Sequence, residues 1–202
     1  PYKRNRTDAR AALSPREAEE DRVFWETFDQ FKDFIINRTN CTVLHNTQLE
    51  ADDLIAGFIQ SHPNDNHVII STDGDFAQLI APNVRQYNGV MEITTTHEGY
   101  FDAKGNPVKD KKTGEAKGAP DPQWLLFEKC MRQGVEHRVL DDYNRNVILC
   151  DLTAQPAEIK TIIQETINTA ITAEKNIPQV GIRLMKFCAE YDLQKISEQV
   201  QS

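Results

Sequence analysis

Apolar residues recur at every third or fourth position after residue 23, which is the spacing of one face of an α-helix. This face consists of Phe24, Phe28, Phe31 and Ile35, and Trp25 and Phe34 widen it. Upstream, Ser14-Pro15-Arg16-Glu17 joins an N-cap serine to proline at the first helical position and glutamate three residues after the cap. We predict a helix from Pro15 to about Asn37 and interpret its aromatic face as core.

Helical and strand patterns then alternate up to about residue 90. A helical face containing Leu54, Ile55, Phe58 and Ile59 begins after Glu50. The apolar run 67–70 predicts a buried strand, a short helical turn follows over 76–80, and 84–87 predicts another strand. A further short strand is expected at 42–44.

Between residues 91 and 120 the pattern is that of a β-hairpin added to this core. Strand-like segments at 92–96 and 99–101 precede turn residues at 102–107. We expect the lysine- and glycine-rich tract that follows to be a mobile, solvated loop.

The rest of the chain is mostly helical. Helices are expected from Pro122 to about Met131, over roughly 156–173, after Pro178 and after Asp192. The run 147–150 fits a strand or an extended crossing segment. The pattern therefore predicts an α/β core over 1–120, which includes the hairpin, and a helical lobe over 121–202.

Composition narrows the class of protein. Of the 202 residues, 39% are hydrophobic and 27% are charged, which is ordinary for a globular chain. No apolar run reaches the roughly 18 residues of a membrane span, and the start of the chain has no signal-peptide core. Cys41, Cys130, Cys150 and Cys188 lack zinc-site spacing, so we expect mostly buried, reduced thiols in a cytoplasmic protein.

Charge is unevenly distributed along the chain. The net charge of −8 argues against indiscriminate nucleic-acid binding. Residues 1–10 and 104–118 are nevertheless net basic, and the second segment holds Lys104, Lys109, Lys111, Lys112 and Lys117. A metal-dependent enzyme acting on a polyphosphate needs an acidic centre with basic flanks, although segment 104–118 by itself is typical of a solvated turn.

Two acidic runs supply that centre. Glu50, Asp52 and Asp53 lie at the start of one predicted helix, and Asp73 and Asp75 follow the strand 67–70. Sequential elements are usually neighbours, so up to five carboxylates converge, and like charges in that number need cations. Hard oxygen ligands suit Mg²⁺ or Mn²⁺. Taken singly, either run is also typical of a helix start or an Asp-Gly turn.

These motifs together resemble the 5′-nuclease family, which includes flap endonucleases, and most closely the RNase H type of T-even phages. Tyr2-Lys3-Arg4-Asn5-Arg6 resembles the basic motif that opens the family's helical arch, and Glu50-Ala51-Asp52-Asp53 resembles one metal motif. Ser71-Thr72-Asp73-Gly74-Asp75-Phe76 resembles the second metal motif. The likeness spans about residues 1–90, with a weaker one from Tyr143 to Asp151.

The resemblance implies a PIN-like, mostly parallel sheet flanked by helices with a helical arch, followed by a mostly helical lobe. It implies a nuclease that cleaves RNA primers or 5′ DNA flaps with two metal ions during DNA replication. The implied ligands are Glu50, Asp52, Asp73 and Asp75, with Asp53 adjacent, and Lys3 and Arg6 would contact phosphate. The implied DNA-binding residues are Tyr2, Lys3, Arg4, Arg6 and Arg10.

Implied partners are DNA and RNA–DNA hybrids with 5′ ends or flaps, and a single-strand-binding protein or sliding clamp is a candidate. We expect no membrane association, a monomer, and a phage-infected bacterial cytoplasm as the setting. Two departures stand out: the family's first aspartate-bearing strand would precede Pro1, and its Gly-Asp-x-x-Asp-Asn motif is missing near 133–135. We expect those segments to be omitted from the sequence.

Two other functions remain open at this point. A PIN-type ribonuclease shares the acidic residues, but it lacks the arch. A non-catalytic binder of branched DNA would keep the fold with an incomplete metal site. A phosphatase using Asp-Gly-Asp fits poorly, because its nucleophilic aspartate should follow the first strand of the sheet.

Overall fold

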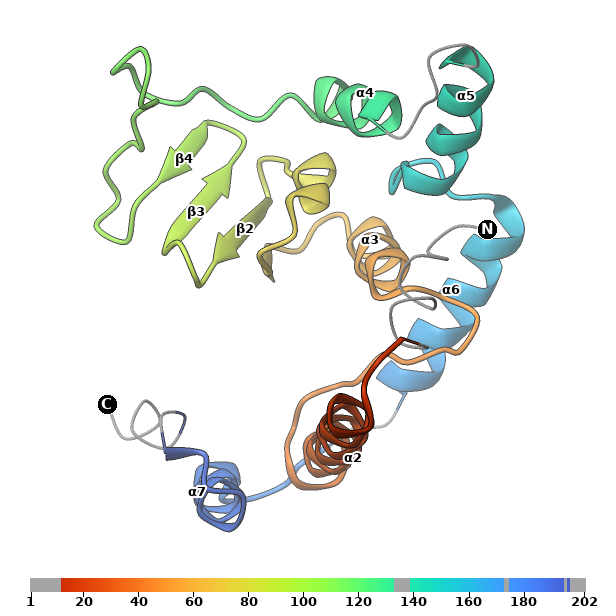
Figure 1. The fold of residues 1–202 in the computed structure, drawn as a ribbon, viewed down its shortest axis with the longest axis vertical. Coiled ribbons are helices and arrows are strands. Elements are labelled where there is room, and N and C mark those ends of the chain that lie inside the picture. The colour runs from red at the N-terminus through yellow and green to blue at the C-terminus, as the bar shows by residue number, and fades with distance from the viewer. Residues whose placement is uncertain (1–11, 133–138, 173–174, 195, 197–202) are drawn as a thin grey trace. The chain divides into compact units, whose positions relative to one another are not determined.

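The computed structural model describes residues 12–132, 139–172, 175–194 and 196 (Figure 1). Contacts divide the chain into two compact units: residues 44–169 form one, and the first 43 residues with those from Ala170 onward form the other. The predicted division at residue 120 stays a prediction.

The unit formed by residues 44–169 contains a four-stranded sheet. Its strands are β1 (His67–Ile70), β2 (Val84–Asn88), β3 (Ile93–Thr96) and β4 (Gly99–Phe101), in the order β1-β2-β3-β4. β1 is parallel to β2, whereas β3 and β4 add antiparallel pairs. The predicted α/β class is confirmed, and the antiparallel strands are those of the predicted hairpin.

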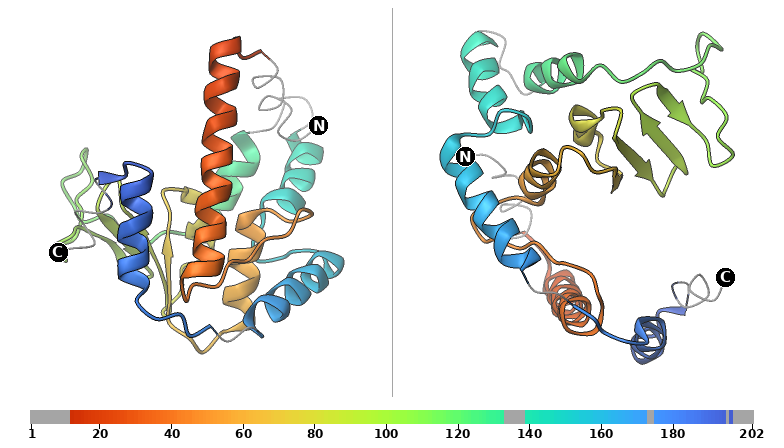
Figure 2. Two further views of the ribbon diagram at one scale, coloured as in Figure 1. Left: turned by 90° about the horizontal axis from the view of Figure 1, so that it is seen from below. Right: turned by 180° about the vertical axis from the view of Figure 1, so that it is seen from behind.

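The core of this unit lies where two helices meet the sheet. α3 (Ala51–Ser61) contributes Ala56, and η1 (Gly74–Leu79), a 3₁₀ helix, contributes Phe76 and Leu79. The core also contains Ile69, Val84 and Leu152. From the front (Figure 1) and from behind (Figure 2, right), η1 lies between α3 and the strands. This arrangement joins the two predicted acidic segments through one hydrophobic core.

The predicted strand over 67–70 is present as β1, but it is buried on one face only. Ile69 is buried, but its neighbours Val68 and Ile70 are 48% and 77% exposed. Residues on a strand alternate between faces, so only one face of β1 contributes to the core.

The added hairpin has more structure than a mobile loop. After β4, Phe101 bridges Pro107 and Lys109 bridges Ala116, both in antiparallel pairing. The Val108 N–H donates to the Tyr100 carbonyl (2.8 Å), and the Lys117 N–H donates to the Val108 carbonyl (2.8 Å). The tract thus continues the meander beyond β4.

Three helices complete the unit: α4 (Pro122–Arg132), α5 (Val139–Cys150) and α6 (Ala157–Ile171). Oδ1 of Asp121 accepts hydrogen bonds from the N–H groups of Gln123 and Trp124, as expected for a helix cap. The run 147–150, predicted as extended, belongs to α5. Buried Asn146 and Cys150 are one helical turn apart, a spacing that the short apolar run concealed.

The other unit pairs α2 (Pro15–Arg38) with α7 (Val180–Glu190). The predicted cap is present: the Glu17 N–H donates to Ser14 Oγ (3.4 Å), and the Ser14 N–H donates to Glu17 Oε2 (2.9 Å). The ring of Phe187 in α7 lies 5.8 Å from that of Phe31 and 4.6 Å from that of Phe34.

The interpretation of the whole aromatic face of α2 as core is wrong for the described residues. No residue of α2 is buried, and the rings of Phe24, Trp25 and Phe28 contact one another while remaining exposed. Only the C-terminal half of the face meets α7. The strand predicted at 42–44 is also absent, because that segment pairs with no described strand.

The described cysteines form no disulfide, and Cys130, Cys150 and Cys188 are buried, whereas Cys41 is exposed. Among the described helices, none combines the length and apolarity needed to cross a membrane.

Candidate metal centre

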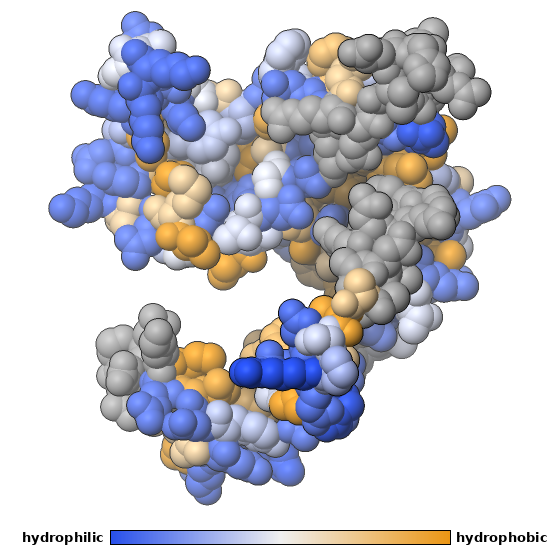
Figure 3. Space-filling view, in the orientation of Figure 1, coloured by the Kyte–Doolittle hydropathy of each residue, from blue (hydrophilic) through white to orange (hydrophobic). Residues whose placement is uncertain are grey.

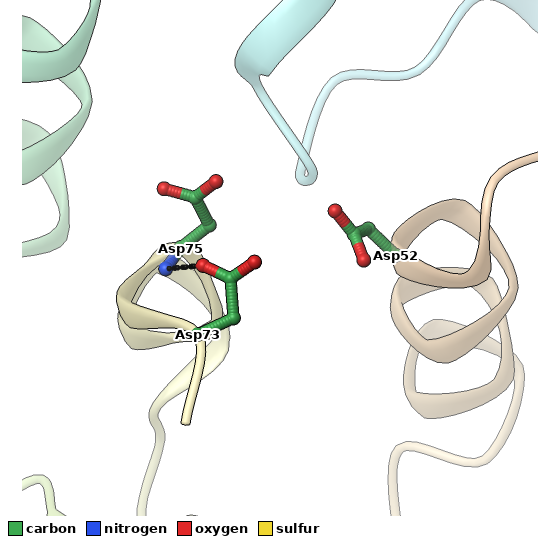
Figure 4. Close-up of side chains that lie close together, drawn as sticks. All are labelled: Asp52, Asp73 and Asp75. Carbon is green, nitrogen blue, oxygen red and sulfur yellow. Dashed lines mark hydrogen bonds between the residues drawn. The ribbon is translucent and has the colours of Figure 1, made fainter. Parts of the chain in front are cut away.

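Three of the predicted carboxylates meet at one place. Asp52, in the first turn of α3, projects toward Asp73 and Asp75 at the start of η1 (Figure 4). One carboxylate oxygen from each residue lies within 4.8 Å of the others. Asp73 is exposed and the other two are partly exposed, so water and ions reach the cluster.

Asp73 is also the N-cap of η1. Its Oδ1 accepts a hydrogen bond from the Asp75 N–H (3.0 Å), and its own N–H donates to Ser71 Oγ (3.1 Å). These bonds turn the chain sharply after β1 and bring two carboxylates to the same end of η1. The Ser-Thr-Asp-Gly-Asp run is therefore a structural turn as well as a source of ligands.

A buried glutamine holds that turn from the neighbouring strand. Nε2 of Gln86 in β2 donates to the carbonyl oxygens of Ser71 (2.9 Å) and Asp73 (2.7 Å). Gln86 is not among the site residues predicted from the sequence. The sequence feature that could have identified it is a polar side chain two positions after Val84, at an inward-facing position of the strand.

The segment 150–155, which begins at the last residue of α5, ties the two acidic elements together. Its anchors in η1 and α3 are Gln78, Gln60 and Asp53. Gln78 Nε2 donates to the Cys150 carbonyl (3.2 Å), and its Oε1 accepts from the Leu152 N–H (3.3 Å). Gln60 Nε2 donates to the Leu152 carbonyl (3.0 Å). We call segment 150–155 the brace.

Two predicted ligands lie outside the cluster of three. Asp53 Oδ1 accepts a hydrogen bond from Gln155 Nε2 (2.8 Å), and its Oδ2 accepts from the Glu50 N–H (3.3 Å). Asp53 thereby joins α3 to the brace. Glu50 is the exposed N-cap residue of α3. The remaining predicted site residues, Tyr2, Lys3, Arg4, Arg6 and Arg10, lie outside the described part of the chain, as does the region 133–135.

Gln155 has a further property. It is buried, and its Oε1 has no hydrogen-bond partner among the described residues, although its Nε2 is bonded to both the carbonyl and the carboxylate of Asp53. An unsatisfied buried carbonyl costs free energy, which the two bonds to Asp53 partly offset. The contact between the brace and α3 therefore carries a free-energy cost at Gln155 Oε1.

The donor set of the cluster fits a small divalent cation. Mg²⁺ takes oxygen ligands at about 2.0–2.1 Å in an octahedron, so its ligand atoms lie roughly 3–4 Å apart. Three carboxylate oxygens within 4.8 Å of one another approach that spacing. Their negative charges also repel one another, and a bound cation relieves this repulsion.

A cavity elsewhere on the sheet is separate from this cluster. Its volume is about 400 Å³, and His67, Arg85 and His97 are among its lining residues. It lies at the end where β1 begins, whereas the carboxylates follow the end of β1. The cavity is therefore not part of the metal centre.

Comparison with known proteins agrees with this geometry. A family model for the 5′-3′ exonuclease, N-terminal resolvase-like domain matches residues 1–111, more than half of the chain. That range includes all three clustered aspartates. A search of curated proteins gave no match.

Proposed function

The chain belongs to the family of the 5′-3′ exonuclease, N-terminal resolvase-like domain, and from this premise we propose that it is a metal-dependent, structure-specific 5′ to 3′ nuclease. Its substrates would be RNA primers or 5′ DNA flaps removed during DNA replication, including RNA–DNA hybrids. The observation that carries the proposal is the convergence of Asp52, Asp73 and Asp75 from two elements of the matched domain.

In this proposal the three aspartates hold two Mg²⁺ or Mn²⁺ ions, with Glu50 and Asp53 as additional candidates at the start of α3. Bound divalent cations supply Lewis-acid stabilisation of the charge that develops on a scissile phosphate. The carboxylates fix positions and do not themselves transfer protons. Gln86 and the brace hold the turn and the helix that present them.

Lys3 and Arg6 are proposed to neutralise charge on the phosphate in the transition state. Tyr2, Arg4 and Arg10 are proposed to contact the DNA strand beside them. Support for these roles is the family match over residues 1–111 together with the basic composition of residues 1–10. A single-strand-binding protein or a sliding clamp remains a candidate partner in replication.

The deciding experiment measures cleavage of 5′-labelled flap, nicked-duplex and RNA-primed substrates by this chain in Mg²⁺, in Mn²⁺ and in EDTA. The proposal expects short 5′ products that require the metal. Tight binding of branched DNA without cleavage in either metal would overturn it and favour a non-catalytic binding protein. Cleavage confined to single-stranded RNA would instead favour a PIN-type ribonuclease.

A further inference from the structure

We propose that the lysine-rich hairpin, residues 102–118, is a binding surface for the phosphate backbone of duplex nucleic acid. The hairpin extends the sheet beyond β4, whereas the metal centre lies next to β1 at the other side of the strand order. Because its placement is judged relative to the cleavage site, the inference rests on the proposed nuclease function.

All five lysines of the hairpin are exposed: Lys104, Lys109, Lys111, Lys112 and Lys117. None of them forms an ion pair with a carboxylate of the described residues. Hydrophilic side chains cover this region of the molecule, at the upper left of Figure 3. Lys117 also lies over the ring of Tyr100, 5.5 Å from its centroid. Exposed lysines without carboxylate partners, gathered along one hairpin, are the electrostatic footprint that a phosphate backbone requires.

The acidic residues of the hairpin are engaged with its backbone. Asp102 Oδ1 accepts from the N–H groups of Lys104 (2.8 Å) and Asn106 (2.8 Å), and Asp110 Oδ1 accepts from those of Lys112 (2.8 Å) and Thr113 (3.1 Å). These N–H groups lower the pKa of both carboxyls. The carboxylates therefore act as turn-forming acceptors and hold the lysines in two defined turns.

The sheet register places one turn of the hairpin at the end of the strands where the metal centre lies. Ile70 pairs with Tyr87, Tyr87 with Thr94, and Thr94 with Phe101. The turn after Phe101, which carries Lys104, therefore lies at the same end of the strands as Asp73, which follows β1. Three strand spacings separate β1 from β4, or about 14 Å.

The meander after β4 extends the basic surface further. Segment 115–117 lies two more spacings from β4, so it is about 24 Å from β1. With a rise of about 3.4 Å per base pair, that distance corresponds to roughly seven base pairs. Counted from the end of β1, which Asp73 follows, a duplex lying along the sheet would therefore meet the hairpin about four to seven base pairs away.

Lysines at the edge of a sheet have another established use, which is to prevent edge-to-edge aggregation. The two uses differ in their consequences. A protective role predicts self-association when the lysines are neutralised, whereas a binding role predicts weaker, less salt-sensitive association with duplex DNA.

The test measures binding of a fluorescent 20-base-pair duplex by anisotropy, in EDTA so that no cleavage occurs, at several salt concentrations. The variant K104Q/K112Q removes one lysine charge from each turn but leaves the backbone bonds to Asp102 and Asp110 available. The matched control, K160Q/K186Q, removes two exposed helical lysines. Circular dichroism and size-exclusion chromatography check the folding and association of both variants.

The proposal expects the hairpin variant to flatten the plot of log K against log salt by about 2 relative to wild type. The control variant should match wild type. The proposal would be overturned if the two variants had equal slopes, or if wild type did not bind duplex DNA. It would also be overturned if the hairpin variant self-associated while its DNA binding stayed unchanged.

The outcome is separable from that of the proposed function. If the wild-type chain never cleaves and the hairpin variant loses duplex binding, only the proposed nuclease activity is refuted. Metal-dependent cleavage by a hairpin variant that binds duplex as wild type does would refute the hairpin alone.

Discussion

Asp73 has two separable roles, because its side chain caps η1 and also carries a charge into the cluster of three. Asparagine keeps an Oδ1 that can accept the Asp75 N–H, yet it lacks the charge. We therefore expect D73N to fold normally and to lose about 100-fold or more of metal-dependent cleavage, the scale seen when metal sites are disturbed. Steady-state kinetics across a Mg²⁺ titration measure the effect.

Asp65 offers the matched control for this substitution. It is exposed, and it lies before β1, away from the carboxylate cluster. D65N should cleave at the wild-type rate. Wild-type turnover by D73N would remove Asp73 from the proposed metal centre.

Gln86 acts on the same turn through its amide. Replacing it by leucine leaves the Ser71 and Asp73 carbonyls without their buried donor, at a cost of about 1–3 kcal/mol in the free energy of unfolding. Because the turn carries Asp73, we also expect Q86L to need more Mg²⁺ for half-maximal cleavage. Urea unfolding and Mg²⁺ titration measure the two effects.

The substitution Q164A is a control for Q86L, since Gln164 is exposed on α6 and bonds only within that helix. It should change neither quantity. If Q86L lost stability but kept the wild-type Mg²⁺ requirement, Gln86 would support the fold without positioning the site.

Among the helices, α3 and α6 pack so closely at Gly57 that no side chain fits there. A Cβ added to Gly57 would lie 2.2 Å from Cγ2 of Ile163. G57A should therefore lower the free energy of unfolding by about 1–3 kcal/mol, the usual cost of overpacking. Chemical denaturation measures this change, and the double variant G57A/I163A should lose less than the sum of the two single losses, because the shortened side chain leaves room for the added Cβ.

Gly181, in α7, is the corresponding control. A Cβ at Gly181 meets nothing within 4 Å, so G181A should stabilise the chain by up to about 1 kcal/mol through helix propensity. A neutral or stabilising G57A would contradict the close packing of α3 on α6.

At the level of elements, the sequence predicted most helices and strands because their signals are local. The Ser14 cap and the apolar periods of α2, α3 and α6 identified those helices within a residue or two. The failures were segments whose state depends on distant partners. Residues 147–150 are helical because α5 packs on α4 through Asn146. Nδ2 of Asn146 donates to the carbonyl oxygen of Cys130 in α4 (3.0 Å).

The aromatic face of α2 failed for a related reason. Its period correctly indicated a helix, but periodicity does not say how much of an apolar face another element covers. Of the aromatic rings on this face, those of Phe31 and Phe34 contact Phe187.

For the molecule as a whole, the carboxylate cluster couples metal binding to stability. Saturating Mg²⁺ or Mn²⁺ should raise the thermal unfolding midpoint, and at about 100 times the dissociation constant the gain is about 2.7 kcal/mol. The gain should shrink in the variant D52N/D73N. Calorimetry at constant ionic strength measures it, with NaCl as the control for general screening.

The double variant also tests the repulsion among the carboxylates. Without divalent metal, D52N/D73N should be at least as stable as wild type, because two like charges are gone. A variant that lost stability in EDTA, or an equal metal-induced gain in both proteins, would contradict a cation site at this cluster.

The centre itself was predictable only in part from the sequence. The positions of Asp52, Asp73 and Asp75 at a helix start and after a strand predicted their convergence, and the structure brings them together. The supports were not predictable, because Gln86 contacts a turn on another strand and the brace contacts residues far upstream. Such pairings depend on the tertiary fold, which short-range patterns do not encode.

The late position of the brace in the chain also determines when, during translation, the metal centre gains this support. Its bonds join residues separated by 72, 92 and 102 positions, so the partners of α3 and η1 leave the ribosome long after those elements do. Chains emerge from the N-terminus, and contacts between distant residues form slowly. A nascent chain that ends before residue 150 therefore has its aspartates and Gln86 but not the brace, which delays maturation of the centre until that segment has been translated.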